Sequence, residues 1–195
     1  MSLLFFYDTE TNGLPDWKSP SEAEHQPHIV QAAGAIVDSE SRETIASVEL
    51  IAKPDGWVIP DEVAAIHGIT TERALQLGVP EREVLTAMLE MWNRCEFRVA
   101  HNEQFDARIL RIAMKRNPDL FEESFMESFR TAPSYCTMRR STPIVRLPGN
   151  KWPKLTEAHQ HFFGRSFDDA HSAMADVRAC IAVYFAIQDM QRKAA

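Results

Sequence analysis

The stretch Leu3–Leu14 reads Leu-Leu-Phe-Phe-Tyr-Asp-Thr-Glu-Thr-Asn-Gly-Leu, and the rest of the chain is arranged around it. Its first five residues are apolar or aromatic, which is typical of a strand buried on both faces. Asp8 and Glu10 follow, and residues two apart on a strand point to the same side. Two ionised carboxylates held close together raise each other's pKa, so the pair favours Mg²⁺ or Mn²⁺ between them. The alternative is a polar strand end before the turn at Asn12 and Gly13.

The length and composition indicate one soluble domain. A chain of 195 residues, 45% apolar and 25% charged, fits a single domain spanning residues 1–195. We find no apolar run of about 18 residues, and no basic region precedes the first apolar run, so neither a membrane span nor a signal peptide is predicted. Cys95, Cys136 and Cys180 are far apart and form no zinc or disulfide pattern, which favours a cytoplasmic location.

The net charge of −7 taken alone argues against a nucleic-acid partner, because phosphate binding requires Lys and Arg. Residues 136–154 contain no acid, however, and carry Arg139, Arg140, Arg146, Lys151 and Lys154. A metal-loaded acidic site can also receive a phosphate. Nucleic acid therefore stays a candidate partner, and a solvated loop is the alternative for the basic segment.

Apolar periodicity predicts alternating strands and helices. Strands are expected over residues 3–7, 28–38, 44–52, 97–100 and 134–138. The first three are joined by short links, which favours an antiparallel meander. Helices are expected over residues 60–67, 70–77, 80–94, 103–116, 154–163 and 172–191. Residues 15–28 and 119–130 are expected to lack regular structure.

Three further residues could carry chemistry. Asp106 lies on the first turn of its helix, where an acid could also serve as a cap. Asp176 lies near the apolar stripe of the last helix, and a buried carboxylate without a partner is costly. His171 is five residues earlier, about 140° away on a continuous helix, so it reaches the same place only from the preceding loop. The alternative for His171 is a cap or a surface residue.

Three motifs resemble those of one known family. Residues 8–14, 101–106 and 171–176 match, in order, the motifs of the DEDDh (DnaQ-like) 3′→5′ exonucleases of the ribonuclease H-like superfamily. Residues 66–70 resemble a segment that this family places beside the terminal nucleotide. The resemblance covers nearly the whole chain. It implies an α/β fold, with a mixed five-stranded sheet (three antiparallel strands, then two parallel) flanked by helices.

The resemblance also implies a chemistry. Asp8, Glu10 and Asp176 would hold one divalent metal ion, Mg²⁺ or Mn²⁺. Asp8 would bridge to a second ion that Asp106 helps to hold. His171 would be the general base. The products would be nucleoside 5′-monophosphates released from the 3′ end of DNA, single-stranded or frayed, as in DNA repair.

Two other functions stay open. One is a 3′→5′ exoribonuclease or oligonucleotidase, and the other is a non-catalytic module of the same fold that binds nucleic acid or a polymerase. The sequence leaves open a homodimer and a polymerase partner.

Substrate contacts are expected from residues that could grip the last base by stacking and backbone contact, although ordinary packing is the alternative for each. They are Thr11, Gly13, Leu14, His67, Ile69, Asn102 and Phe105. Two positions depart from the family pattern. Glu103 stands where a small residue is common, and its charge is expected to repel phosphate or recruit a cation. Ser172 stands where an aspartate is frequent.

Overall fold

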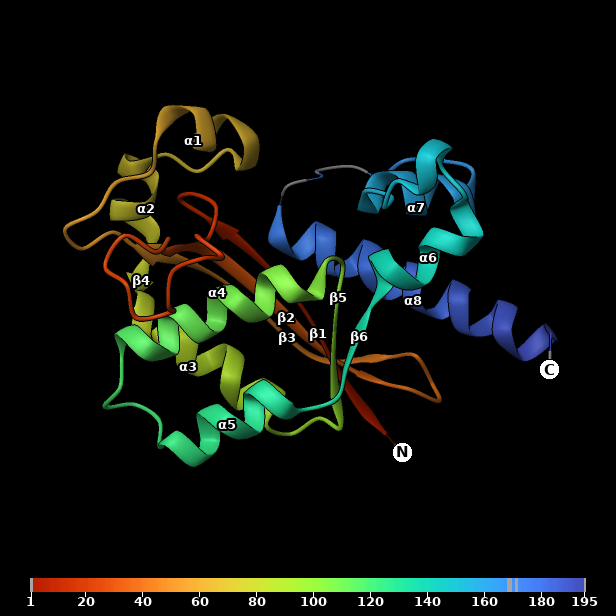
Figure 1. Ribbon diagram of the computed structural model, residues 1–195, viewed down its shortest axis with the longest axis horizontal. Helices are drawn as coiled ribbons and strands as arrows, with labels where there is room; N and C mark the ends of the chain where they lie inside the picture. Colours follow the sequence, from red (N-terminus) through yellow and green to blue (C-terminus); the bar gives the residue numbers. More distant parts are fainter. Residues whose placement is uncertain (1, 168–169, 171, 195) are drawn as a thin grey trace.

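A mixed sheet forms the centre of the protein (Figure 1). The computed structural model describes residues 2–167, 170 and 172–194. The six strands lie in the order β4-β3-β2-β1-β5-β6. Their bounds are β1 Leu3–Thr11, β2 Ile29–Asp38, β3 Thr44–Lys53, β4 Val79–Pro80, β5 Phe97–Ala100 and β6 Ser134–Cys136. β1, β2 and β3 are antiparallel neighbours, whereas β5 and β6 continue the sheet in parallel from β1.

The predicted mixed α/β sheet is confirmed, with one strand more than expected. The added strand, β4, is only two residues long and pairs in parallel with the end of β3. So short a pairing, with Pro80 as one member, leaves no periodic signal in the sequence. β1 also runs farther than predicted and ends at Thr11, so Asp8 and Glu10 lie within the strand.

Helices cover both faces of the sheet. α3 (Glu81–Trp92), α4 (Glu103–Arg116) and α5 (Glu123–Thr131) enclose the core into which Phe5 and Tyr7 point. α8 (Ala173–Ala194) covers the other face, where it packs on Leu4 and Phe6. α6 (Thr137–Val145) and α7 (Leu155–Phe163) pack beside α8, as Figure 1 shows on its right-hand side. Side chains alternate along β1, so this strand is buried by a different helix layer on each face.

Two short helices form a separate small cluster at the start of β2. α1 (Asp61–His67) ends at Gly68, whose φ of 74° is the left-handed conformation that favours glycine. α2 (Thr71–Leu77) begins after Thr70, whose side chain accepts a hydrogen bond from the Arg73 amide. Both helices agree with the sequence prediction. Their apolar residues pack with Val30 and Ile59.

One prediction of irregular structure was wrong. Residues 119–130 contain most of α5, which is held by the buried ring of Phe129. The basic segment, for which a solvated loop was the alternative, contains α6 and the short 3₁₀ turn η1 (Pro148–Asn150). Pro143 lies inside α6, and proline in a helix interior normally signals a break, which is why no helix was predicted there. No helix in the described part of the chain is long and apolar enough to cross a membrane.

Candidate active site

Three carboxylates meet where β1 passes under the start of α8. Asp8 and Glu10 point to the α8 face of the sheet, and Asp176 lies on the first turn of α8. One oxygen from each of the three lies within 4.8 Å of the others, and all three residues are half-buried. Hard carboxylate oxygens at this separation form a donor set suited to Mg²⁺ or Mn²⁺. The structure thus brings together three of the carboxylates predicted as metal ligands.

The cluster is electrostatically strained without a cation. Burial raises the pKa of Asp8 well above its ordinary value, and the charges of Asp106, Asp176 and Glu10 raise it further. Burial, together with the charge of Asp176, raises the pKa of Glu10 to about 8. A pKa shift is a difference in interaction free energy between the charged and neutral forms, so the ionised cluster favours a compensating positive charge.

Asp106, the fourth predicted carboxylate, is held in place by Thr9 of β1, whose side chain points to the face of the sheet opposite that of Asp8 and Glu10. It lies on the first turn of α4 and is 2% exposed. Its Oδ1 atom accepts hydrogen bonds from the Thr9 amide at 2.9 Å and from the Thr9 hydroxyl at 2.8 Å. Burial raises the pKa of Asp106, and these two hydrogen bonds oppose that rise. Because its charge in turn raises the pKa of Asp8, Asp106 belongs to the same electrostatic group.

Glu103 does not present a free charge to the site. Its Oε1 atom accepts a hydrogen bond from Arg98 Nε at 2.6 Å and one from the Tyr7 hydroxyl at 3.2 Å. Tyr7 points to the face of β1 opposite that of Asp8. The expectation that Glu103 repels phosphate or recruits a cation was therefore wrong, because Arg98 neutralises it inside the core. Its charge still contributes to the raised pKa of Asp106.

The first turn of α8 is held by side chains from the sheet. The Ala173 amide donates to Gln31 Oε1 at 3.2 Å, and the Met174 amide donates to Glu49 Oε1 at 3.2 Å. Gln31 Nε2 in turn donates to Glu49 Oε1 at 3.1 Å. These contacts satisfy amide groups that a helix start leaves unpaired, and a carboxylate there also complements the helix dipole. The sequence analysis missed both positioning residues because they lie more than 120 positions before the helix.

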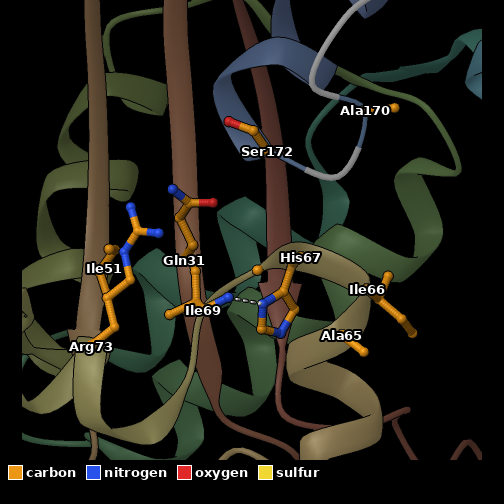
Figure 2. A pocket seen from close by; sticks show the side chains of 10 residues that line it. Gln31, Ile51, Ala65, Ile66, His67, Ile69, Arg73, Ala170 and Ser172 are labelled. Carbon is orange, nitrogen blue, oxygen red and sulfur yellow. Dashed lines mark hydrogen bonds between the residues drawn. The ribbon is translucent and has the colours of Figure 1, made fainter.

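A pocket of 410 Å³ lies beside the cluster. Figure 2 shows Ser172, at the start of α8, above Gln31, with His67 and Ile69 below. The Ile69 amide donates to His67 Nδ1 at 3.2 Å. Gln31 pairs across the strands with Glu10, so this pocket adjoins the carboxylates. Its complete lining consists of Gln31, Ile51, Ala65, Ile66, His67, Gly68, Ile69, Arg73, Ala170 and Ser172.

The other predicted substrate residues do not line this pocket. Leu14 is 85% exposed, and the Thr11 hydroxyl donates to the Gly13 carbonyl at 2.7 Å. Asn102 precedes α4 with a left-handed φ of 69°, and Phe105 is partly buried against the core beneath α4. His171, predicted as the general base, lies outside the described residues. Of the seven residues predicted to contact substrate, His67 and Ile69 line the pocket and the other five do not.

His101 has a structural role that the sequence did not reveal. Its Nε2 atom is 2.9 Å from the Pro153 carbonyl, which can only accept, and its Nδ1 atom is 2.9 Å from the Thr137 hydroxyl. Burial lowers the pKa of His101 to about 4, so the ring is neutral at pH 7 and donates to Pro153 while accepting from Thr137. The turn before Asp106 is thereby tied to α6 and to the end of the basic segment.

Three comparisons place this arrangement among known proteins. A family model described as exonuclease, RNase_T, matches residues 5–184. An uncharacterized exonuclease of Escherichia phage 186 is 30% identical over 187 residues, which cover 93% of this chain and 86% of the phage protein. Exonuclease I of E. coli in complex with a dT13 oligonucleotide has a similar fold, with a TM-score of 0.76 and 22% identity over 100% of this chain.

A second solved structure is similar at higher identity. Exonuclease I from Methylocaldum szegediense has a TM-score of 0.74 and 29% identity over 99% of this chain. The chain spans only 42% of each of these two exonuclease I chains. The similarity thus extends over the whole of this chain and over less than half of those proteins.

Proposed function

Because this chain belongs to the exonuclease family, whose model it matches over residues 5–184, we propose that it is a metal-dependent 3′→5′ exonuclease. It hydrolyses single-stranded or frayed DNA from the 3′ end and releases nucleoside 5′-monophosphates. The observation that carries this proposal is the cluster of Asp8, Glu10 and Asp176, whose oxygens converge within 4.8 Å. Ionised carboxylates this close together repel one another, and a bound cation would offset that repulsion.

The donor set fits divalent metal ions. Asp8, Glu10 and Asp176 would hold one ion, and Asp8 with Asp106 would hold a second. When bound, the ions would supply positive charge beside the phosphodiester and lower the pKa of water. Thr9 keeps Asp106 in place through two hydrogen bonds to its Oδ1 atom.

The chain's own residues supply the remaining parts of the reaction. His171 takes the proton from the attacking water, a role suited to a side chain whose ordinary pKa is near neutrality. The pocket with His67 and Ile69 receives the terminal nucleoside next to Glu10. Leu14 is exposed at the end of the same strand and can wedge against the last base.

DNA is the preferred substrate in this proposal. Several of the similar exonuclease I structures hold single-stranded oligonucleotides, dT13 in one case and dA16 in another. Because this chain spans 42% of those proteins, their activity is not transferred as a whole. The aligned part covers the whole of this chain, including the carboxylates.

The test is an exonuclease assay on 5′-labelled single-stranded DNA and on RNA of the same sequence, with Mg²⁺, with Mn²⁺ and with a chelator. We expect a ladder that shortens from the 3′ end of the DNA and needs metal. Asp8→Asn and Asp176→Asn should each lower the rate about a thousandfold, since charge stabilisation by metal contributes several kcal/mol. The control is Asp119→Asn, because Asp119 is exposed and pairs with Arg82 on α3.

Each other outcome identifies a different function. Faster shortening of RNA than of DNA would favour the exoribonuclease. Binding of both strands with cleavage of neither, under every metal condition, would favour a non-catalytic module that binds nucleic acid. His171→Gln separates the general base from the metal ligands, because it should slow cleavage while Mg²⁺ still raises the thermal stability of the variant.

A further inference from the structure

We propose that an exposed groove on α6 and η1 is a second nucleic-acid site, which binds the single strand upstream of the nucleotide being removed. The groove has a volume of 700 Å³, and it is lined by Arg139, Thr142, Pro143, Arg146, Asn150 and Trp152. The proposal extends the proposed function, because the strand held here is the substrate of the carboxylate site.

The charge of the groove fits a phosphate backbone. Arg139 and Arg146 are exposed, and within the described residues neither forms an ion pair with a carboxylate. Some exposed arginines elsewhere do form such pairs, as Arg82 does with Asp119 and Arg94 with Glu90. In a chain of net charge −7, two arginines without acidic partners in one groove form a local positive region.

An exposed aromatic ring lines the same groove as these charges. Trp152 is 56% exposed, and the guanidinium carbon of Arg139 lies 5.8 Å from the centre of its ring. Exposing a tryptophan to water is costly unless a partner covers it. An arginine beside an aromatic face is the combination with which proteins grip single strands, because bases stack on the ring and phosphates pair with the cation.

The groove is joined to the carboxylate site. Arg139 Nη2 donates to Gln104 Oε1 at 2.8 Å, and Gln104 is two residues before Asp106 on the first turn of α4. From the other side, the hydrogen bond of His101 holds Pro153, the residue after Trp152. A single strand of nucleic acid that runs from the carboxylate site past the start of α4 would therefore contact Arg139 next.

The backbone of the groove is held in a costly conformation. Arg146 ends α6 with a φ of 54°, Gly149 has 68° and Asn150 has 53°. Glycine normally occupies the left-handed position after a helix, so an arginine there is strained. Such strain is common where a side chain is needed for binding, and Arg146 lines the groove.

The test measures binding without cleavage. Fluorescence anisotropy of a labelled oligothymidylate of about 20 nucleotides, in buffer with a chelator, would compare the unaltered protein with Arg139→Gln/Arg146→Gln and with Trp152→Ala. We expect Trp152→Ala to weaken binding about 5- to 150-fold, the range for losing one stacked base. The double variant should reduce the slope of log affinity against log salt by about 1.4, for two lost phosphate contacts on a single strand.

The matched control is Arg82→Gln/Arg94→Gln, at the start of α3 and just after its end, which removes two exposed arginines from the other side of the sheet and should change neither quantity. Circular dichroism would confirm that every variant is folded. Unchanged affinity and slope in both groove variants, or no binding by the unaltered protein, would overturn the proposal and leave an acidic protein surface as the other occupant.

Cross-linking gives an independent measurement. A single 5-bromodeoxyuridine, moved stepwise from the 3′ end, should cross-link to the peptide that contains Trp152 only when it is several nucleotides upstream. Cross-links at the 3′-terminal position instead would contradict an upstream site. Because neither measurement needs cleavage, a protein that bound here but cut nothing would refute the proposed exonuclease activity and leave this site intact.

Discussion

Arg98 is buried in the core behind the carboxylate site and forms an ion pair with Glu103. Its Nη1 atom also donates to the Phe129 carbonyl at 2.5 Å, and its guanidinium lies over the Phe129 ring. Arg98→Met would break this buried ion pair, which costs about 3–5 kcal/mol. We expect a loss of that order in the free energy of unfolding, measured by urea denaturation.

Two further variants distinguish the loss of the buried ion pair from a loss of packing as the cause of the destabilisation. Arg82→Met breaks the exposed pair with Asp119 and should cost less than about 1 kcal/mol. Arg98→Met/Glu103→Leu removes both buried charges and should recover much of the loss, since a buried pair often contributes little against apolar side chains of similar size. A double variant as unstable as Arg98→Met alone would show that the pair is not the cause.

Residues of the site differ in how far the sequence reveals them. Asp8 and Glu10 were predictable because an uninterrupted apolar run and a period of two fix their direction. The pairing of Glu103 with Arg98 was not, because it depends on how β5 and α4 pack after the chain turns. His101 was within a recognised motif, yet its partners Thr137 and Pro153 are 36 and 52 positions away.

The position of the first turn of α8 depends on Glu49, which accepts a hydrogen bond from the Met174 amide. Glu49→Ala removes the acceptor of the Met174 amide and should loosen the turn that bears Asp176. We expect the Mg²⁺ concentration that gives half of the thermal stabilisation to rise about tenfold, as for residues that orient metal ligands. Glu49→Gln keeps an oxygen acceptor and should stay near the wild-type value.

The control for Glu49 is Glu43→Ala, which removes an exposed glutamate just before β3. A helix anchor that serves stability alone would lower the melting temperature of Glu49→Ala without changing its Mg²⁺ response. That result would exclude Glu49 as a positioning residue for Asp176.

The attachment of β4 rests on Gly78. A Cβ atom there would lie 2.5 Å from the Ala74 carbonyl oxygen and 2.6 Å from the Lys53 amide nitrogen, both backbone atoms that cannot turn aside. Gly78→Ala should therefore cost about 3 kcal/mol, at the upper end for overpacking. Gly13→Ala is the control, since a Cβ at Gly13 meets nothing within 4 Å. Equal melting temperatures of the two variants would contradict the close approach.

Elements were predictable where their patterns were long. The strands of the meander and the helices α3 and α8 have many apolar residues at regular spacing, so their existence was clear from the sequence. α5 has nine residues and one fully buried ring, and α6 contains a proline. In both, packing against a neighbour stabilises what local preference alone would not.

At the scale of the whole molecule, the carboxylates make stability depend on pH and metal. The folded protein binds protons at Asp8 and Glu10 at pH values where the unfolded chain has lost them. Stability of the metal-free protein therefore falls as pH rises from about 4, the ordinary carboxyl pKa, to about 8, the pKa of Glu10. We expect a loss on the order of 2 kcal/mol over this range, measured by thermal unfolding in chelator.

Addition of Mg²⁺ and one double variant test whether these carboxylates cause the loss of stability with rising pH. Mg²⁺ should raise the melting temperature more at pH 8 than at pH 5, because protonated carboxyls bind it poorly. Asp8→Asn/Glu10→Gln should lack most of the pH-dependent loss and most of the response to Mg²⁺. A double variant with the same pH profile as the unaltered protein would assign the loss to other groups.

The alternation along β1 has a consequence for how this chain can tolerate insertions. Asp8 and Glu10 face α8, while Tyr7 and Thr9 face α4 and hold Glu103 and Asp106. Inserting one residue upstream within β1 would exchange the two sets, so that the carboxylates entered the aromatic core and the tyrosine faced the cations. In a library of insertions, β1 should thus reject single-residue insertions far more strictly than the loop of residues 15–28 does. The register of β1 therefore determines both the packing of the core and the position of the carboxylates.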